Sequence, residues 1–230
     1  MNFLAHALPY LSSDPLVAVA TGIPDWLSVI DRRVRARRKM AIQHVGSDDP
    51  VLARVARGIV AHVDDDQWFH SGALFTRLNM EQAVALRNRL PGDAGFRPSF
   101  VAHIGIEMLI DSNFIEARRD VAEDYYLAVS EIDAESMTRA IETITGQQIN
   151  GMRELLKRFT ASRFLFDYVE DAGLLNRINQ VLARVTLPPL PADTTSWIQD
   201  LRVLVRQNMD ELLTPEGAAM QHPTVRWASP

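Results

Sequence analysis

The sequence predicts an all-α protein, and three observations support this fold class. Apolar residues recur at intervals of three and four along nearly every long segment, which is the spacing that places them on one face of a helix. Alternating apolar and polar runs bounded by turn residues, the signature of β-strands, are hard to find. With 230 residues, 47% of them hydrophobic, the chain can bury a sizeable core. We therefore expect a single compact multi-helix domain covering residues 1–230.

The expected helices are separated by glycine and proline. Apolar stripes are clearest over residues 150–170 and from Trp197 to Leu212. Breaks fall at Gly22 and Pro24, at 46–50, at 91–93 and in the proline-rich stretch 187–191. Between these breaks we expect further helices over about 2–11, 14–21, 25–42, 50–70, 73–89, 98–117, 120–131, 134–145 and 174–185.

Composition excludes several classes of function. The chain has no cysteine, which rules out disulfides, thiolate zinc sites and cysteine nucleophiles. The net charge of -5 argues against wholesale binding to nucleic acid, so no specific nucleic-acid partner is predicted. No apolar run reaches the roughly 20 residues needed to span a bilayer, and the apolar N-terminus lacks the basic leader of a signal peptide. We expect no membrane span and a cytoplasmic location.

The first candidate site is a ladder of polar residues in the helix expected over 50–70. His62, Asp66 and His70 follow one another at four-residue intervals, so they share one helical face. His62 and His70 are separated by about 12 Å along the axis, too far for both to bind one ion comfortably. Asp66, between them, is positioned to bridge two ions. We expect Asp64 and Asp65 to be solvated, although Asp65 is close enough in helical angle to compete with Asp66.

A second ladder lies in the apolar helix expected over 98–117. His103, Glu107 and Asp111 occupy one stripe of it. Imidazoles and carboxylates on a helix that faces the core must be hydrogen-bonded, paired or bound to metal, because leaving them bare costs several kcal/mol. Asp111 has the alternative role of orienting a ligating histidine. The two ladders could form the two walls of one metal site between helices.

Two residues near the start of the chain complete the candidate set. His6 stands in an apolar run, and Asp25 follows the Gly22 and Pro24 turn. As the first residue of a helix, Asp25 could instead be a cap that needs no metal. The predicted metal ligands are His6, Asp25, His62, Asp66, His70, His103 and Glu107.

This mixed nitrogen and oxygen set suits zinc, manganese or iron better than magnesium alone, and we expect two divalent ions. Asp66 and Glu107 are also the candidate catalytic residues, since one carboxylate could act as a general base.

A basic segment lies close in sequence to Asp25. Six of the eight residues from Arg32 to Lys39 are basic. One interpretation is a solvated helix face; the other is a docking patch for an acidic partner or a phosphate group. The basic residues are Arg32, Arg33, Arg35, Arg37, Arg38 and Lys39.

The motifs resemble two families. The opening Met-Asn-Phe-Leu-Ala-His, the 58–70 helix with His62 and Asp66, and the pair His103 and Glu107 resemble bacterial acyl carrier protein phosphodiesterase. That resemblance implies a helical, HD-phosphatase-like fold and a divalent metal, usually manganese or magnesium. It also implies an enzyme that releases phosphopantetheine from the carrier protein by hydrolysis.

The Gly22-x-Pro24-Asp25 turn followed by the two ladders is similar to the zinc-dependent phospholipase C family. That similarity implies a phospholipase C-like fold in which the seven predicted residues bind metal. Both resemblances fall within about the first 115 residues, so we expect a metal-site part over about 1–117, a helical C-terminal part over about 118–213 and a loose tail over 214–230.

These observations predict a metal-dependent phosphoester hydrolase, in which metal-bound hydroxide attacks the phosphorus of a phosphodiester. One alternative is a carrier-protein phosphodiesterase that docks an acidic partner on the basic segment. Another is a helical scaffold or binding protein without catalytic activity, which retains only a vestigial site.

Overall fold

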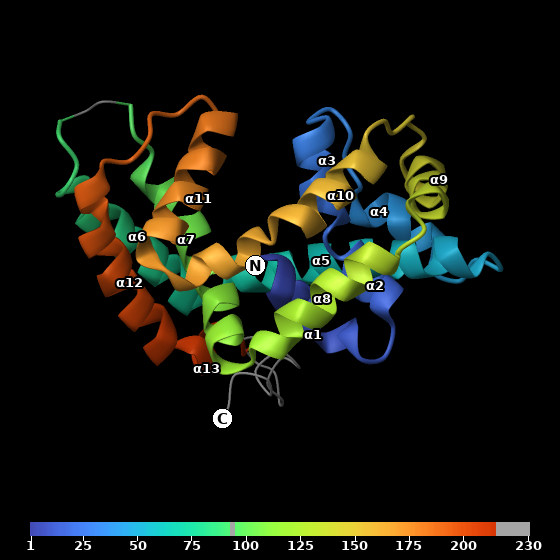
Figure 1. The fold of residues 1–230 in the computed structure, drawn as a ribbon, viewed down its shortest axis with the longest axis horizontal. Helices are drawn as coiled ribbons and strands as arrows, with labels where there is room; N and C mark the ends of the chain where they lie inside the picture. Colours follow the sequence, from blue (N-terminus) through green and yellow to red (C-terminus); the bar gives the residue numbers. More distant parts are fainter. Residues whose placement is uncertain (93–94, 215–230) are drawn as a thin grey trace. The chain divides into compact units, whose positions relative to one another are not determined.

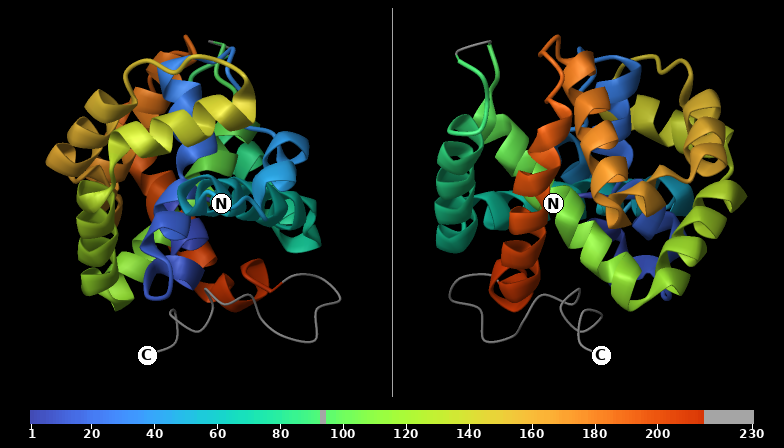
Figure 2. Two further views of the ribbon diagram at one scale, coloured as in Figure 1. Left: turned by 90° about the vertical axis from the view of Figure 1, so that its right-hand side faces the viewer. Right: turned by 60° about the vertical axis from the view of Figure 1, so that its left-hand side comes forward.

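A computed structural model describes residues 1–92 and 95–214, and helices are the regular secondary structure of those residues (Figure 1). The two further views in Figure 2 also show no strand in the described part. The predicted all-α class is confirmed. None of the described helices is long and apolar enough to cross a membrane. Residues 215–230 of the predicted tail and Asp93 of a predicted break lie outside the described residues.

Contacts divide the described chain into two units, each discontinuous in sequence. Unit 1 contains Met1–Asn2, Trp68–Arg118 and residues 164–214, and unit 2 contains Phe3–Gln67 and Arg119–Arg163. Helix α5 (Pro50–Ser71) belongs to unit 2 up to Gln67 and to unit 1 from Trp68. The prediction of one domain, made of a metal-site part up to about residue 117 and a helical C-terminal part after it, stays a prediction.

Unit 2 combines helices from its two separate stretches of the chain. Besides most of α5, its elements are α1 (Phe3–Leu11), α2 (Pro15–Ala20), α3 (Ile23–Ile30), α4 (Arg38–Ala41), the 3₁₀ helix η1 (Ile42–His44), α8 (Arg119–Glu131), α9 (Ala134–Thr145) and α10 (Met152–Ser162).

The core of unit 2 fixes α1, the helix that carries His6. α1 packs against α2 and α8, and α10 packs against α3, α8 and α9. The rings of Phe3, Trp26 and Phe159 join α1, α3 and α10: their centroids lie 5.3 Å apart for Phe3 and Phe159, and 5.5 Å apart for Trp26 and Phe159. Edge-on aromatic contacts at this spacing add to the stabilisation from area burial.

Unit 1 surrounds α7 (Pro98–Ala117), which contacts α6, η2, α11 and α12. Its other elements are α6 (Ala73–Arg87), η2 (Phe164–Val169), α11 (Asp171–Arg184), η3 (Ala192–Thr194), α12 (Thr195–Gln207) and α13 (Met209–Leu212).

Arg202 of α12 ties these helices together. Its guanidinium donates to Ser112 Oγ of α7 at 2.7 Å, to the Asp171 carboxylate of α11 at 3.0 Å and to the Tyr168 carbonyl of η2 at 3.0 Å. The side chain is mostly buried, so its charge depends on these partners. The C-terminal part of the chain, which carries no motif, therefore positions the helix that bears His103 and Glu107.

The predicted helix over 25–42 is wrong. Helix α3 ends at Ile30, and only Arg38–Ala41 of the basic segment is α-helical. The Asp31 carboxylate accepts hydrogen bonds from the Arg33 backbone N–H and guanidinium, a local arrangement that competes with helix. Between them and α4 the chain alternates, with Val34 and Ala36 buried and the arginines exposed. That period of two is typical of extended chain.

The continuous helix expected over 150–170 is also wrong. α10 ends at Ser162, and Arg163 adopts a left-handed conformation with φ 47 before the 3₁₀ helix η2 begins. The Arg163 guanidinium pairs with Glu123 and lies 5.3 Å from the centroid of the Tyr126 ring. These contacts offset the cost of a left-handed backbone at a residue with a side chain.

Gly58 allows α5 to approach α2 more closely than a side chain would permit. A Cβ at this position would lie 2.5 Å from the Ala20 Cβ and 2.8 Å from the Val17 carbonyl oxygen. The Val17 oxygen is backbone and cannot rotate away. Gly58 precedes His62 by one turn of α5, so this close contact sets the position of His62.

We predict that Gly58→Ala destabilises the protein by about 1–3 kcal/mol, because α5 must move away from α2. Gly46→Ala is the matched control, since nothing lies within 4 Å of its added Cβ. Urea unfolding followed by circular dichroism measures both variants. Equal stability of Gly58→Ala and Gly46→Ala would show that the close contact is not a constraint.

Candidate metal centres

The structure gathers six of the seven predicted ligands into two groups. The His6 group consists of His6, His62 and Asp66, and in each group one ligand atom per residue lies within 4.8 Å of the others. The His103 group consists of His70, His103 and Glu107. All members of the His6 group belong to unit 2, and all members of the His103 group belong to unit 1.

The two histidines of the His6 group are buried, whereas the Asp66 side chain is 30% exposed. His6 is 1% exposed and His62 5% exposed, and their rings lie 4.3 Å apart between centroids. The Asp66 carboxylate faces both rings: Oδ1 lies 3.3 Å from His6 Nε2, and Oδ2 lies 3.3 Å from His62 Nε2. His62 and Asp66 share a face of α5 because they are one turn apart, whereas His6 is brought in by the packing of α1.

Asp65 is the residue that the sequence interpretation placed wrongly. It is 8% exposed rather than solvated, and its carboxylate lies 3.1 Å from His6 Nδ1. An Nδ1–H donated to Asp65 leaves Nε2 of a neutral His6 as a bare lone pair directed toward Asp66. The opposing carboxylate oxygen is also an acceptor, and among the described residues Nε2 has no hydrogen-bond partner.

Two acceptors at 3.3 Å repel unless a cation lies between them or a proton sits on the ring. Asp64, by contrast, is partly exposed and pairs with Arg38. From helical angles alone, Asp65 and Asp66 could only be treated as alternatives for one ligand position. In the structure both carboxylates contact His6, Asp65 at Nδ1 and Asp66 at Nε2.

The His103 group is more accessible. His70 Nε2 lies 2.8 Å and His103 Nε2 3.2 Å from the same oxygen of Glu107, Oε1. The Met1 amino group lies 3.1 Å from this oxygen. The side chains of His70 and His103 are 32% and 33% exposed, compared with 15% for Glu107. The Phe75 ring packs against both imidazoles, with centroid distances of 5.3 and 5.1 Å.

The surroundings shift the pKa values of these groups. Burial alone lowers the pKa of His6, but the facing carboxylates of Asp65 and Asp66 outweigh it and raise the pKa to about 9. Burial raises the pKa of Asp66 and of Glu107. The imidazoles of His6 and His62 more than reverse this for Asp66, and the Met1 amino group with the imidazoles of His103 and His70 does so for Glu107, so both pKa values lie below their ordinary range. The two carboxylates are therefore ionised at neutral pH.

Asp25 and Asp111 belong to neither group. Asp25 lies in the first turn of α3 and is half-buried, and Asp111 is completely buried in α7. Metal binding by Asp25 stays a prediction, as does the bridging of two ions by Asp66. The docking role of the basic segment also stays a prediction, but its residues do not form one helix face.

The chain was compared with protein-family models, with curated proteins and with solved structures, and no match was found.

The raised pKa of His6 predicts a pH dependence for the protein freed of metal with a chelator. A folded-state pKa of about 9, above the unfolded value of 6.5, gives stability that is present below pH 6.5 and lost as the pH rises toward 9. We expect the free energy of unfolding to fall by roughly 1–3 kcal/mol over this window.

Asp65→Asn keeps an acceptor for Nδ1–H and removes the charge, so the His6 pKa, measured by NMR, should drop. Asp64→Asn, the neighbouring carboxylate that pairs with Arg38, is the control and should leave the His6 pKa unchanged. An unchanged pKa in Asp65→Asn would contradict the assigned contact.

Proposed function

We propose that the protein is a metal-dependent phosphoester hydrolase, in which the His6 group and the His103 group each hold a divalent ion. The observation that carries the proposal is the spacing of the ligand atoms. Two ligands bound at about 2.1 Å in a tetrahedral site are about 3.4 Å apart. The nitrogen-to-oxygen separations of 3.3 Å in the His6 group and of 3.2 Å between His103 and Glu107 come close to this spacing. His70 lies closer to Glu107, at the hydrogen-bond distance of 2.8 Å, and would move back slightly on binding an ion.

The chemistry of the ligand sets supports the same conclusion. Each group offers two imidazole nitrogens and one carboxylate, a combination suited to zinc, manganese or iron. Metal-binding histidines commonly donate a hydrogen bond from their other ring nitrogen to a carboxylate, which orients the ring. Asp65 is placed to accept such a bond from His6 Nδ1. Nε2 of His6 is a buried polar atom that faces the Asp66 carboxylate at 3.3 Å, and a bound ion would take the place of the proton between them.

A bound divalent ion supplies Lewis acidity, which polarises a phosphoryl oxygen and lowers the pKa of water. The residues of the chain would set its position. Asp66 and Glu107, both ionised, offset the charge of the ions, and the histidines provide neutral nitrogen ligands. Phosphoester hydrolysis is favoured because the order of these residues resembles that of helical metal-dependent phosphoesterases.

The proposal predicts metal in the protein purified without chelator, measured by elemental analysis. His62→Ala should lose the ion of the His6 group, and His103→Ala the ion of the His103 group. Hydrolysis of bis(4-nitrophenyl) phosphate should fall more than about 100-fold in either variant, since loss of a ligand exceeds the effect of losing a residue that merely orients one. His44→Ala, which belongs to neither group, is the matched control.

Less than about a tenth of an equivalent of transition metal, with no activation on adding one, would contradict the proposal. A scaffold held together by hydrogen bonds gives a different result: His62→Ala and His103→Ala would lower the melting temperature equally with and without chelator.

A further inference from the structure

A cavity of about 440 Å³ opens beside the His103 group. His103 lines it, together with Arg87 at the end of α6, Arg97 just before α7, and the aromatic residues Phe96 and Phe100. All of these residues belong to unit 1. The volume lies in the range of small-molecule sites, and one wall is a candidate metal ligand, so a molecule in the cavity would lie next to that group.

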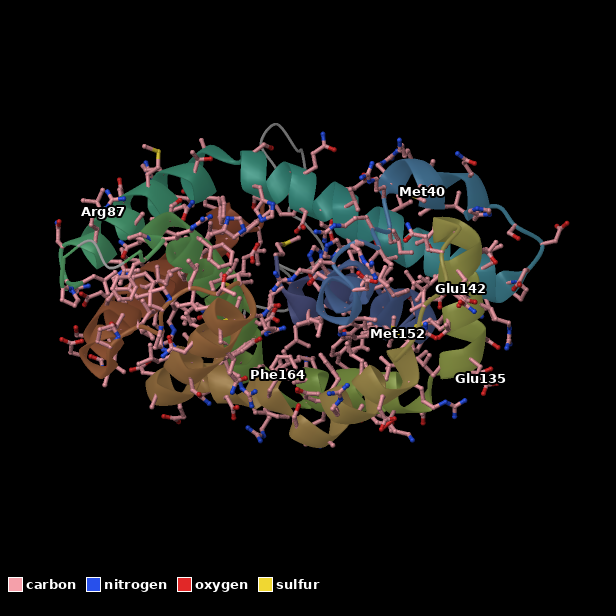
Figure 3. All side chains as sticks on the ribbon, turned by 90° about the horizontal axis from the view of Figure 1, so that it is seen from above. Met40, Arg87, Glu135, Glu142, Met152 and Phe164 are labelled. Atoms are coloured by element: carbon pink, nitrogen blue, oxygen red, sulfur yellow. The ribbon has the colours of Figure 1, made fainter. Side chains whose placement is uncertain are left out.

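The described residues that line this cavity carry only positive charge. Arg87 and Arg97 contribute two guanidinium groups, and no carboxylate is among the described residues that line it. Within residues 1–92 and 95–214, neither arginine forms an ion pair. Figure 3 labels Arg87 on the ribbon of α6. Guanidinium groups bind phosphate oxygens through paired N–H donors, which makes arginine well suited to phosphate recognition.

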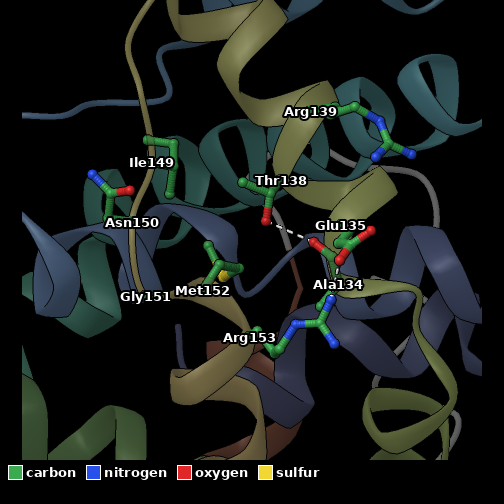
Figure 4. Close-up of a pocket in the computed structure, with 9 residues that line it drawn as sticks. All are labelled: Ala134, Glu135, Thr138, Arg139, Ile149, Asn150, Gly151, Met152 and Arg153. Carbon is green, nitrogen blue, oxygen red and sulfur yellow. Dashed lines mark hydrogen bonds and ion pairs between the residues drawn. The ribbon is translucent and has the colours of Figure 1, made fainter.

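Two other cavities show a different arrangement. In the unit 2 cavity of Figure 4, the guanidinium of Arg153 pairs with Glu135, which lines the same cavity. In a second unit 2 cavity, Arg163 pairs with Glu123. Arg153 and Arg163 already have a carboxylate partner, which an anion would have to displace. Arg139, which also lines the cavity of Figure 4, donates to Ser136 Oγ and has the Glu135 carboxylate on the same cavity wall. In the cavity at His103, an anion would not have to displace a carboxylate of any described residue from Arg87 or Arg97.

The start of α7 adds to the positive potential. Arg97 is its N-cap residue and gives no side-chain capping hydrogen bond. Ser99 and Phe100, which line the cavity, belong to the first turn of this 20-residue helix, at the positive end of the helix dipole.

We propose that this cavity binds the substrate as a phosphoester with an apolar or aromatic substituent. Arg87 and Arg97 bind the phosphoryl oxygens, and Phe96 and Phe100 contact the substituent, with the ester group next to His103. This proposal rests on the proposed function, because it makes the His103 group the point of contact with the substrate.

Binding of phenyl phosphate to chelator-treated protein, measured by isothermal titration calorimetry, tests the cavity without catalysis. Arg87→Gln and Arg97→Gln should each weaken binding roughly tenfold, the loss expected for one charge-assisted contact. Arg77→Gln is the matched control: Arg77 is an exposed arginine of the same helix that does not line the cavity. Phe100→Leu should weaken binding of phenyl phosphate and leave binding of inorganic phosphate unchanged.

In the metal-loaded protein, Arg87→Gln should raise KM for bis(4-nitrophenyl) phosphate with kcat and metal content close to wild type. If the wild-type protein contains metal and hydrolyses the ester, but Arg87→Gln and Arg97→Gln leave both phenyl phosphate binding and KM unchanged, the cavity proposal is overturned. The proposed function would then still stand. Binding of phenyl phosphate that depends on Arg87 and Arg97 in a protein without metal or hydrolysis would support the cavity as an anion site and overturn the proposed function. An equal loss of binding in Arg77→Gln would also overturn the cavity proposal.

Discussion

The arrangement of the site depends on one electrostatic constraint: carboxylate oxygens face imidazole nitrogens at 3.3 Å or less inside the protein. Asp66 faces His6 and His62 in this way, and Glu107 faces His70 and His103. With His6 Nδ1–H committed to Asp65, the facing lone pairs are tolerable only with a proton or a metal ion between them. The two outcomes are alternatives, since protonation and metal compete for the same nitrogen.

The surrounding helices hold these side chains in place against that repulsion. In unit 2, the absence of a side chain at Gly58 lets α5 approach α2, and the ring cluster of Phe3, Trp26 and Phe159 fixes α1. In unit 1, the hydrogen bonds of Arg202 join α7 to α11 and η2. Phe159 of α10 and Arg202 of α12 belong to helices that carry no ligand, so each group depends on later parts of the chain as well as on its own helices.

Helical periodicity accounts for what could be predicted from the sequence. Because residues four apart share a helix face, the pairs of His62 with Asp66 and of His103 with Glu107 follow from spacing alone. His6 joins the pair of His62 and Asp66, and His70 joins the pair of His103 and Glu107, only through packing between segments that are distant in the sequence. Asp65 was placed wrongly because helical angle describes one face and ignores a partner arriving from another helix. The turn after α3 was missed because the pairing of Asp31 with Arg33 outweighs helix propensity.

The two groups differ in access. The nitrogens of the His6 group are buried, whereas the histidines of the His103 group are about one-third exposed and His103 lines a cavity. The proposed chemistry accordingly assigns substrate contact to the His103 group.

The most direct test of the account is a crystal structure of the protein purified without chelator, with anomalous diffraction measured at the absorption edge of the metal found in it. The account predicts one anomalous peak between His6, His62 and Asp66, and another between His70, His103 and Glu107. The absence of a peak at both positions, with metal in excess in the crystal, would contradict it.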